Sequence, residues 1–195
     1  MKVEVTNFLI FEKMNNQVSI DEFVDYWSIQ YEYPDKLYSS NINNVSFEIS
    51  HLNELFEWKN GMALSELKQN SLNKKVVKKI EVINNLKINF NESIFYTEFG
   101  KVSAIWQIFL KHIIAPSEYP IFDMHVYRAF KYLQTEKKDV HLPYSDTEKL
   151  TIYEKEYRPF YLYLEKQMKK NKSKKLDEAL WAFGKFLSTY PKMIS

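Results

Sequence analysis

Turn-forming residues are scarce in this chain, and their scarcity restricts its fold more than any other feature. Only 3 glycines and 6 prolines interrupt 195 residues. A β fold needs turns at short intervals, and glycine and proline are the residues that mark them most strongly. The sequence therefore predicts an all-α protein whose helices are joined by short connections, with at most a marginal strand at residues 2–11.

Apolar residues recur at helical spacing along most of the chain. Residues three or four apart lie on the same face of a helix, so each such set predicts one buried face. The sets are Phe23, Tyr26 and Trp27; Leu52, Leu55 and Phe56; Leu72, Val76, Ile80, Ile83 and Lys87, read as one longer helix; Val102, Ile105, Phe109 and Ile113; and Leu176, Leu180, Phe183 and Leu187.

Several residues mark where helices begin and end. Ser19 and Glu22 have the spacing of a capping box, as do Ser145 and Glu148. Gly61 is expected to end the helix that follows Ser50, because glycine closes helices readily. Pro159 is expected to break or kink the helix that Ser145 begins, because a proline ring clashes with the carbonyl four residues before it.

The net charge is small, but the lysines are clustered. There are 27 Lys and Arg residues against 25 Asp and Glu residues, a formal charge of +2. A lysine cluster is either a solvated face or a set of local charges that contact phosphates. Both interpretations stay open for the two clusters, which are Lys74, Lys75, Lys78 and Lys79, and Lys166, Lys169, Lys170, Lys172, Lys174 and Lys175.

Cysteine is absent, and this excludes several kinds of chemistry. A disulfide, a thiolate nucleophile and a cysteine-ligated zinc or iron–sulfur cluster all require it. The four histidines (51, 112, 125 and 141) have no metal-binding i, i+4 spacing, so we expect no metal and no other cofactor. Since neither a signal peptide nor a membrane-spanning run is visible, we expect a cytoplasmic protein.

Asp123 is the candidate catalytic residue. It precedes a helical pattern, and aspartate is a favoured N-cap, so a purely capping role is the simpler interpretation. A carboxylate is also suited to stabilising a developing cation and to orienting an attacking water. His125 and Arg128 lie three residues apart on the helix that Asp123 begins, where Arg128 either contacts a phosphate or pairs with a carboxylate.

The segment from Pro120 to Ala129 resembles a signature of the helix-hairpin-helix DNA glycosylases of the endonuclease III-like superfamily. That signature runs apolar, Asp, any residue, His, Val or Ile, aromatic, Arg, small apolar, as in Phe122-Asp123-Met124-His125-Val126-Tyr127-Arg128-Ala129. Residues 99–104 resemble the end of the family's hairpin and the start of its second helix. Residues 180–185, followed by Pro191, resemble its closing helix. The resemblance covers about residues 95–195.

This resemblance implies a two-lobed helical fold with a central cleft. One lobe would hold residues 50–120, and the other would combine residues 1–49 with residues 121–195. It also implies that flat side chains hold a base that has been flipped out of the DNA stack. The implied residues are Asp123 as the catalytic carboxylate; Gly100, Lys101, Ser103 and Arg128 against DNA phosphates; and Phe99, Trp106 and His125 around the base, with Trp58 and Trp181 as further aromatic candidates.

Two departures from the family pattern shape the expected activity. Glu98 stands where the hairpin has a second glycine, and Val102 stands at the position of the lysine that gives some members lyase activity. The resemblance therefore implies a monofunctional glycosylase that acts as a monomer on DNA, without a membrane or an iron–sulfur cluster. A non-catalytic nucleic-acid-binding protein and a helical protein-interaction protein are the alternatives.

Overall fold

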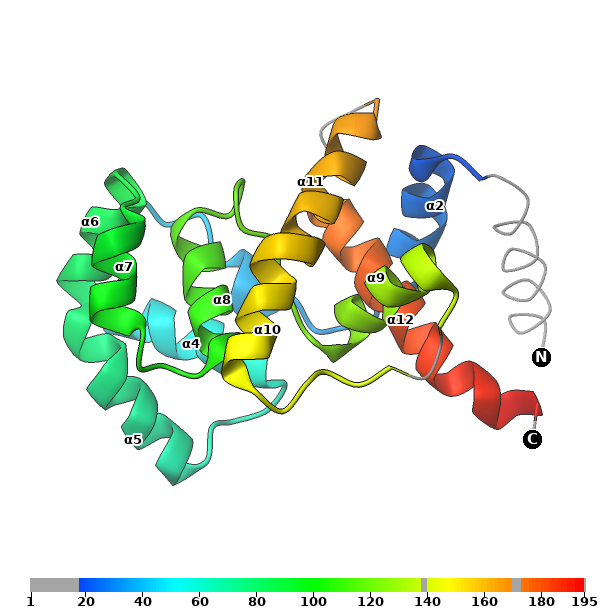
Figure 1. Cartoon of the computed structure of the whole chain (residues 1–195). Helices are drawn as coiled ribbons and strands as arrows, with labels where there is room; N and C mark the ends of the chain where they lie inside the picture. Colours follow the sequence, from blue (N-terminus) through cyan, green and yellow to red (C-terminus); the bar gives the residue numbers. More distant parts are fainter. Residues whose placement is uncertain (1–17, 138–139, 170–172, 195) are drawn as a thin grey trace. The chain divides into compact units, whose positions relative to one another are not determined.

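The chain is all-helical wherever its structure is described. The computed structural model describes residues 18–137, 140–169 and 173–194, with only the main chain from residue 190 onward, so the possible strand at residues 2–11 and the side chain of Pro191 lie outside it. Every regular element in these ranges is helical, which confirms the predicted class (Figure 1). The elements are α2 (Ile20–Trp27), η1 (Ser28–Gln30), α3 (Lys36–Ser39), α4 (Ile49–Asn60), α5 (Glu66–Lys75), η2 (Val77–Lys79), α6 (Ile80–Ile88), α7 (Glu92–Phe99), α8 (Ala104–Ile114), α9 (Met124–Thr135), α10 (Asp146–Ile152), η3 (Tyr153–Tyr157), α11 (Arg158–Gln167) and α12 (Ser173–Ile194).

The chain forms two compact units, each of which combines separate stretches of sequence. Unit 1 consists of Met1–Glu32, Asp123–Leu142 and Glu154–Ser195. Unit 2 consists of Tyr33–Phe122 and Pro143–Tyr153. Helix α10 therefore belongs to unit 2, although the chain before and after it belongs to unit 1.

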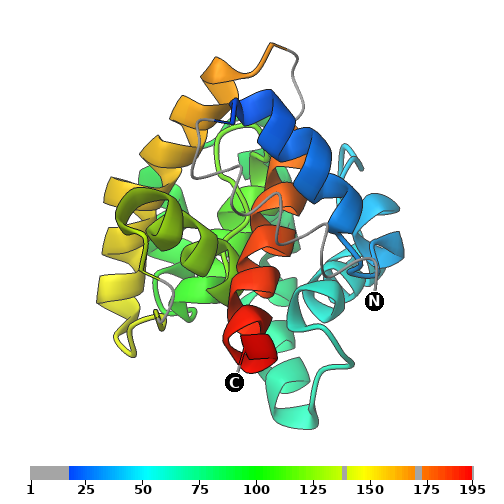
Figure 2. The same cartoon turned by 90° about the vertical axis from the view of Figure 1, so that its right-hand side faces the viewer.

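Helix α12 is the centre of unit 1. Its predicted apolar face is confirmed, because Leu176, Leu180, Phe183 and Leu187 are all buried. Figure 2 shows α12 (red) against α2 (blue). At this contact, the ring of Phe183 lies 5.5 Å from that of Phe23 and 5.0 Å from that of Trp27. Aromatic pairs at such distances add to the stabilisation that burial provides.

Gly184 allows α12 to approach the start of α9 very closely. A Cβ atom at this position would lie 1.8 Å from the main-chain oxygen of His125. No real Cβ contact is that short, and the atom it would meet belongs to the backbone, which cannot rotate away as a side chain can. Any side chain at residue 184 would therefore force the two helices apart.

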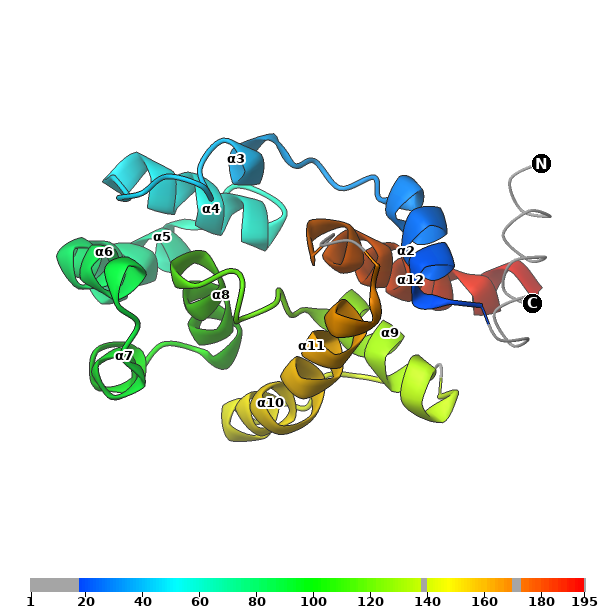
Figure 3. The ribbon, with the colours of Figure 1, turned by 90° about the horizontal axis from the view of Figure 1, so that it is seen from above.

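Unit 2 is built around α8. From Gln107 to Ile114 every residue of this helix is buried. Figure 3 shows α8 beside α6, and α3 beside α4. The face predicted for α4 is confirmed by the burial of Leu52, Leu55 and Phe56. The predicted stop is confirmed as well, because Gly61 follows α4 in the left-handed conformation, with φ +78°.

The long helix predicted through residues 72–87 is wrong. Helix α5 ends at Lys75, residues Val77–Lys79 form a 3₁₀ turn, and α6 begins at Ile80. Val76 has φ −122° and ψ −63°, outside the helical range. Neighbouring residues of a continuous helix point about 100° apart, so they do not share one buried face. The break allows both Val76 and Val77 to be buried, and this packing outweighs the continuity of the helix.

Local signals at helix ends were more reliable. The capping box of α2 is confirmed, with the amide of Glu22 donating to Ser19 Oγ (3.3 Å) and the amide of Ser19 donating to Glu22 Oε2 (3.0 Å). The predicted break before Pro159 is also confirmed. A π-helical segment, η3, separates α10 from α11, and Pro159 lies in the first turn of α11, where a missing amide hydrogen costs little.

We predict that Gly184→Ala destabilises unit 1 by about 3 kcal/mol, the upper end of the usual cost of overpacking, because the added methyl group must displace the backbone at His125. Urea denaturation, followed by the fluorescence of Trp27 and Trp181, measures this loss. Thr189→Ala changes an exposed residue of the same helix and serves as the control. An unchanged urea midpoint for Gly184→Ala contradicts the close approach of α9 and α12.

Candidate functional site

Residues 92–114 form a helix, a short turn and a second helix. The side chain of Asn91 begins α7 by accepting from the amide of Ile94 (3.0 Å). The turn at residues 100–103 then leads into α8. Gln107, which is buried, holds this turn from inside, because its Nε2 donates to the carbonyls of Val102 (2.5 Å) and Gly100 (3.3 Å). This role of Gln107 carries no sequence signal that would have revealed it.

Lysines from the first cluster lie at this turn. Lys75 Nζ donates to the main-chain oxygen of Lys101 (3.3 Å). Lys79 Nζ lies 3.0 Å from the carboxylate of Glu98 and also donates to its main-chain oxygen. The ion pair compensates the negative charge of Glu98, while Lys101 itself is exposed. The turn and half of the first lysine cluster thus form one positively charged surface.

A groove runs along the same surface, between α5 and α8. Its volume is about 290 Å³, and it lies wholly within unit 2. Trp106 lines it, and the indole ring is supported by Phe56, with ring centroids 5.1 Å apart and planes nearly perpendicular. The complete lining is Leu67, Lys68, Ser71, Lys75, Val102, Ser103 and Trp106.

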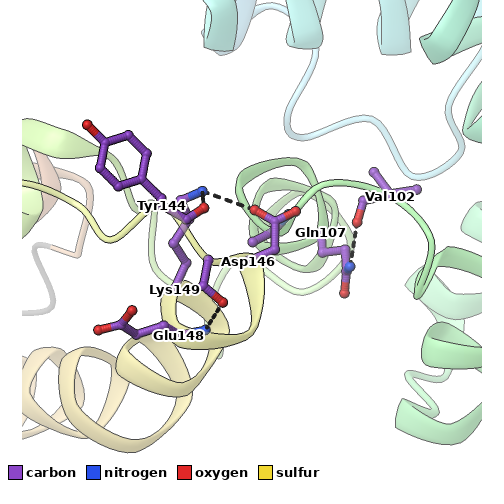
Figure 4. Close-up of polar contacts among 8 residues, drawn as sticks. Val102, Gln107, Tyr144, Asp146, Glu148 and Lys149 are labelled. Atoms are coloured by element: carbon purple, nitrogen blue, oxygen red, sulfur yellow. Dashed lines mark hydrogen bonds and ion pairs between the residues drawn. The ribbon is translucent and has the colours of Figure 1, made fainter.

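Asp146 binds the amino-terminal end of α8. The amide of Ala104 donates to Asp146 Oδ2 (3.1 Å), while Lys149 Nζ lies 3.0 Å from Oδ1 (Figure 4). Lys149 also donates to the carbonyl of Tyr144 (3.0 Å). The hydrogen bond from Lys149 and the one from Ala104 both lower the pKa of Asp146, the former more strongly. An external phosphate at this amide would have to displace the carboxylate.

Asp123 begins α9, as predicted. Its Oδ1 accepts from the amide of Val126 (3.0 Å), which confirms the N-cap. The residue is half-buried and belongs to unit 1. One carboxylate oxygen is therefore used by the helix that Asp123 begins.

His125 and Arg128 lie where α9 meets α12. Arg128 Nη1 donates to the main-chain oxygen of Gly184 (3.0 Å) and lies 3.4 Å from His125 Nδ1. The ring of His125 lies 5.0 Å from that of Trp181. Burial lowers the pKa of His125, so its ring is mainly neutral at pH 7. Through these contacts both residues help to join α9 to α12.

The candidate aromatic residues have different surroundings. Phe99 is fully buried, with its ring 5.4 Å from that of Phe95. Trp58 is buried too, and packs against Tyr38. Trp106 and Trp181 are half-buried. Of these four, Trp106 is the one that lines the groove beside the lysines.

His112 is a buried histidine whose titration is strongly perturbed. Its Nδ1 lies 2.7 Å from the main-chain oxygen of Tyr119, to which it must donate, so its Nε2 accepts from the hydroxyl of Tyr38 (2.7 Å). Burial lowers the pKa of His112 to about 4. Since both ring nitrogens are bonded and the side chain is inaccessible, its role is to satisfy polar groups in the core.

Nowhere in residues 18–137, 140–169 and 173–194 do three His, Asp or Glu side chains gather closely enough to hold a metal ion. Within the same ranges, no helix has the length and apolar character required to span a membrane.

No family model, curated protein or solved structure matches this chain. The resemblance of residues 95–195 to the helix-hairpin-helix glycosylases therefore stays a hypothesis, as do the lobes and the cleft that it implies.

We predict that Asp146→Asn lowers the free energy of unfolding at pH 7 by about 0.5 kcal/mol, a small loss because the side chain is half-exposed. The folded state lowers the pKa of this carboxyl below its ordinary 3.8. Its stabilisation is therefore complete above pH 3.8 and disappears as the pH falls further.

Thermal melts between about pH 2 and about pH 7 test this pH dependence, because this range spans the titration of a carboxyl group. Glu148→Gln removes a charge from the same first turn of α10 without touching α8 and is the matched control. A stability difference for Asp146→Asn that persists at the lowest pH contradicts the assignment.

Proposed function

We propose that this protein binds nucleic acid through the turn at residues 100–103 and the lysines around it. The observation that carries the proposal is that Lys75 and Lys79 lie at the turn to which Lys101 also belongs. Phosphate contacts require positive charge at one place rather than a basic protein as a whole. A net charge of +2 is therefore no obstacle.

The pairing of charges around the turn favours an anionic partner. Glu98 is compensated by Lys79, and Asp146 is compensated by Lys149. Within the described residues, no carboxylate forms an ion pair with Lys75 or Lys101. Lys75 and Lys101 are thus left to contact phosphates, and the two acids beside the turn, Glu98 and Asp146, are already compensated.

Phosphate binding is assigned to these side chains rather than to the amide of Ala104. That amide is bonded to Asp146, so the classical use of a helix amino terminus for anions is not open here without a rearrangement. Gly100, Lys101 and Ser103, which are exposed, are proposed to contact phosphates together with Lys75.

We predict that replacing Lys75 and Lys101 together by glutamine weakens binding to duplex DNA. The dependence of log Kd on log salt should fall by about 0.9 for each phosphate contact that is lost. Fluorescence anisotropy of a labelled duplex between about 50 and about 200 mM salt measures both effects. Lys36→Gln, which changes an exposed lysine elsewhere in unit 2, should leave them unchanged.

A second proposal is base excision, with Asp123 as the essential carboxylate. The resemblance of residues 120–129 to the glycosylase signature supports it, and so does the position of Asp123 at the first turn of α9. In this reaction the bond between the base and the sugar C1′ breaks, the base leaves with the bonding electrons, and water adds its oxygen to C1′. A carboxylate beside C1′ stabilises the cationic sugar and takes the proton of the water, which then passes to the released base.

The proposed excision is hydrolytic, without a Schiff base. Val102 occupies the position of the lyase lysine and is buried, while Lys101 belongs to the exposed part of the turn. A buried valine cannot form an imine with the sugar aldehyde. The product would therefore be an abasic site with an intact strand.

We predict that Asp123→Asn slows release of free base by at least about 100-fold, because asparagine lacks the charge that the reaction requires. Asparagine caps helices as well as aspartate does, so stability and DNA binding should be retained. Asp123→Ala, in contrast, should also cost about 1 kcal/mol of stability.

Chromatography of the bases released from duplexes with single damaged bases measures the activity. If the wild-type protein releases none of them while binding is normal, base excision is excluded and nucleic-acid binding stands alone.

A further inference from the structure

The groove between α5 and α8 has the features of a site for one unpaired nucleotide. We propose that it holds a single base of a single-stranded nucleic acid against Trp106, with the neighbouring phosphates at Lys68 and Lys75. This inference rests on the proposed nucleic-acid binding and goes beyond it, because it states the form of nucleic acid that is bound and the place of one base.

The size of the groove favours one nucleotide. Its volume of about 290 Å³ is at the lower limit of pockets that hold small ligands, which is about 300 Å³. A base pair would need room for two bases at once. In a duplex, moreover, the faces of the bases are covered by their neighbours, whereas an unpaired base offers its face to an aromatic ring.

Trp106 supplies a firm surface for stacking. Its ring is held from the core side by the perpendicular contact with Phe56. The groove continues over Leu67, which is 84% exposed, and over Val102. The exposed leucine and the supported indole form an apolar surface that a base would cover. The apolar face of the base would be removed from water in the same step.

The lysines at the groove are held by neutral oxygen atoms. Lys68 Nζ is bonded to the amide oxygen of Asn60 (2.6 Å), and Lys75 Nζ to the carbonyl of Lys101 (3.3 Å). Both acceptors are neutral, so they orient the ammonium groups without compensating them. Ser71 and Ser103 add hydroxyl groups that can bond to a sugar or a phosphate.

An apolar peptide fits this surface less well than a nucleotide does. Two uncompensated ammonium groups would face apolar side chains and lose hydration without a counter-charge. An acidic peptide would satisfy the lysines but leave the indole and Leu67 uncovered. A nucleotide satisfies both, because it joins a flat apolar ring to an anion.

The test uses the whole protein and a fluorescein-labelled short oligothymidylate, with a blunt duplex as the second probe. Trp106→Leu should weaken binding of the single strand about tenfold, and Trp106→Phe should weaken it less because phenylalanine still stacks. Lys68→Gln should lower the salt dependence for the single strand by about 0.7 and leave the duplex unaffected. Lys36→Gln is the control for the loss of a lysine charge.

Intrinsic fluorescence gives a second readout. Adding the oligothymidylate should quench indole emission, and the quenching should be lost in Trp106→Phe, although Trp27, Trp58 and Trp181 remain. Poly-glutamate, an anion without bases, should not displace the oligothymidylate at equal charge concentration.

The outcomes separate the two proposals. If the wild-type protein binds neither probe, nucleic-acid binding itself fails and the inference fails with it. If it binds but Trp106→Leu and Lys68→Gln bind the single strand as the wild type does, only the groove assignment is overturned. Equal competition by poly-glutamate overturns it too, since charge alone would then explain binding.

Discussion

Helix α8 is buried on every side from Gln107 to Ile114, and the arrangement of unit 2 depends on it. Because this part of the helix is completely buried, its polar residues need hydrogen-bonding or charged partners. Lys111 has them in the hydroxyl of Tyr96 (2.9 Å) and the carboxylate of Glu92 (3.4 Å), and His112 has them in Tyr38 and Tyr119. With α8 fixed in this way, Gln107 holds the turn before it, and Trp106 is directed along the groove.

The charges around this turn come from distant parts of the chain. Lys75 and Lys79 precede it by two helices, α6 and α7, and Asp146 follows it from α10. Glu98 and Asp146 are each compensated by a lysine, so Lys75 and Lys101 define the sign of the surface around the turn. This balance supports an anionic partner, although the composition of the whole chain is nearly neutral.

Unit 1 contains Asp123, the candidate catalytic residue. Asp123 caps α9, and the same end of α9 is held against α12 by the close approach at Gly184 and by the bond from Arg128. A catalytic carboxylate needs a fixed position, and this packing provides one whatever Asp123 does beyond capping.

The sequence by itself determined the helical class, the apolar faces of α4 and α12, and the caps at Ser19 and Asp123, because these depend on residues within a few positions of each other. It did not determine the break at Val76, where burial of two adjacent valines outweighed helical periodicity. Nor did it indicate that the first lysine cluster meets the turn, or that Trp106 rather than Phe99 lies along a groove. Those features depend on contacts between residues far apart in the chain, and only the tertiary structure brings such residues together.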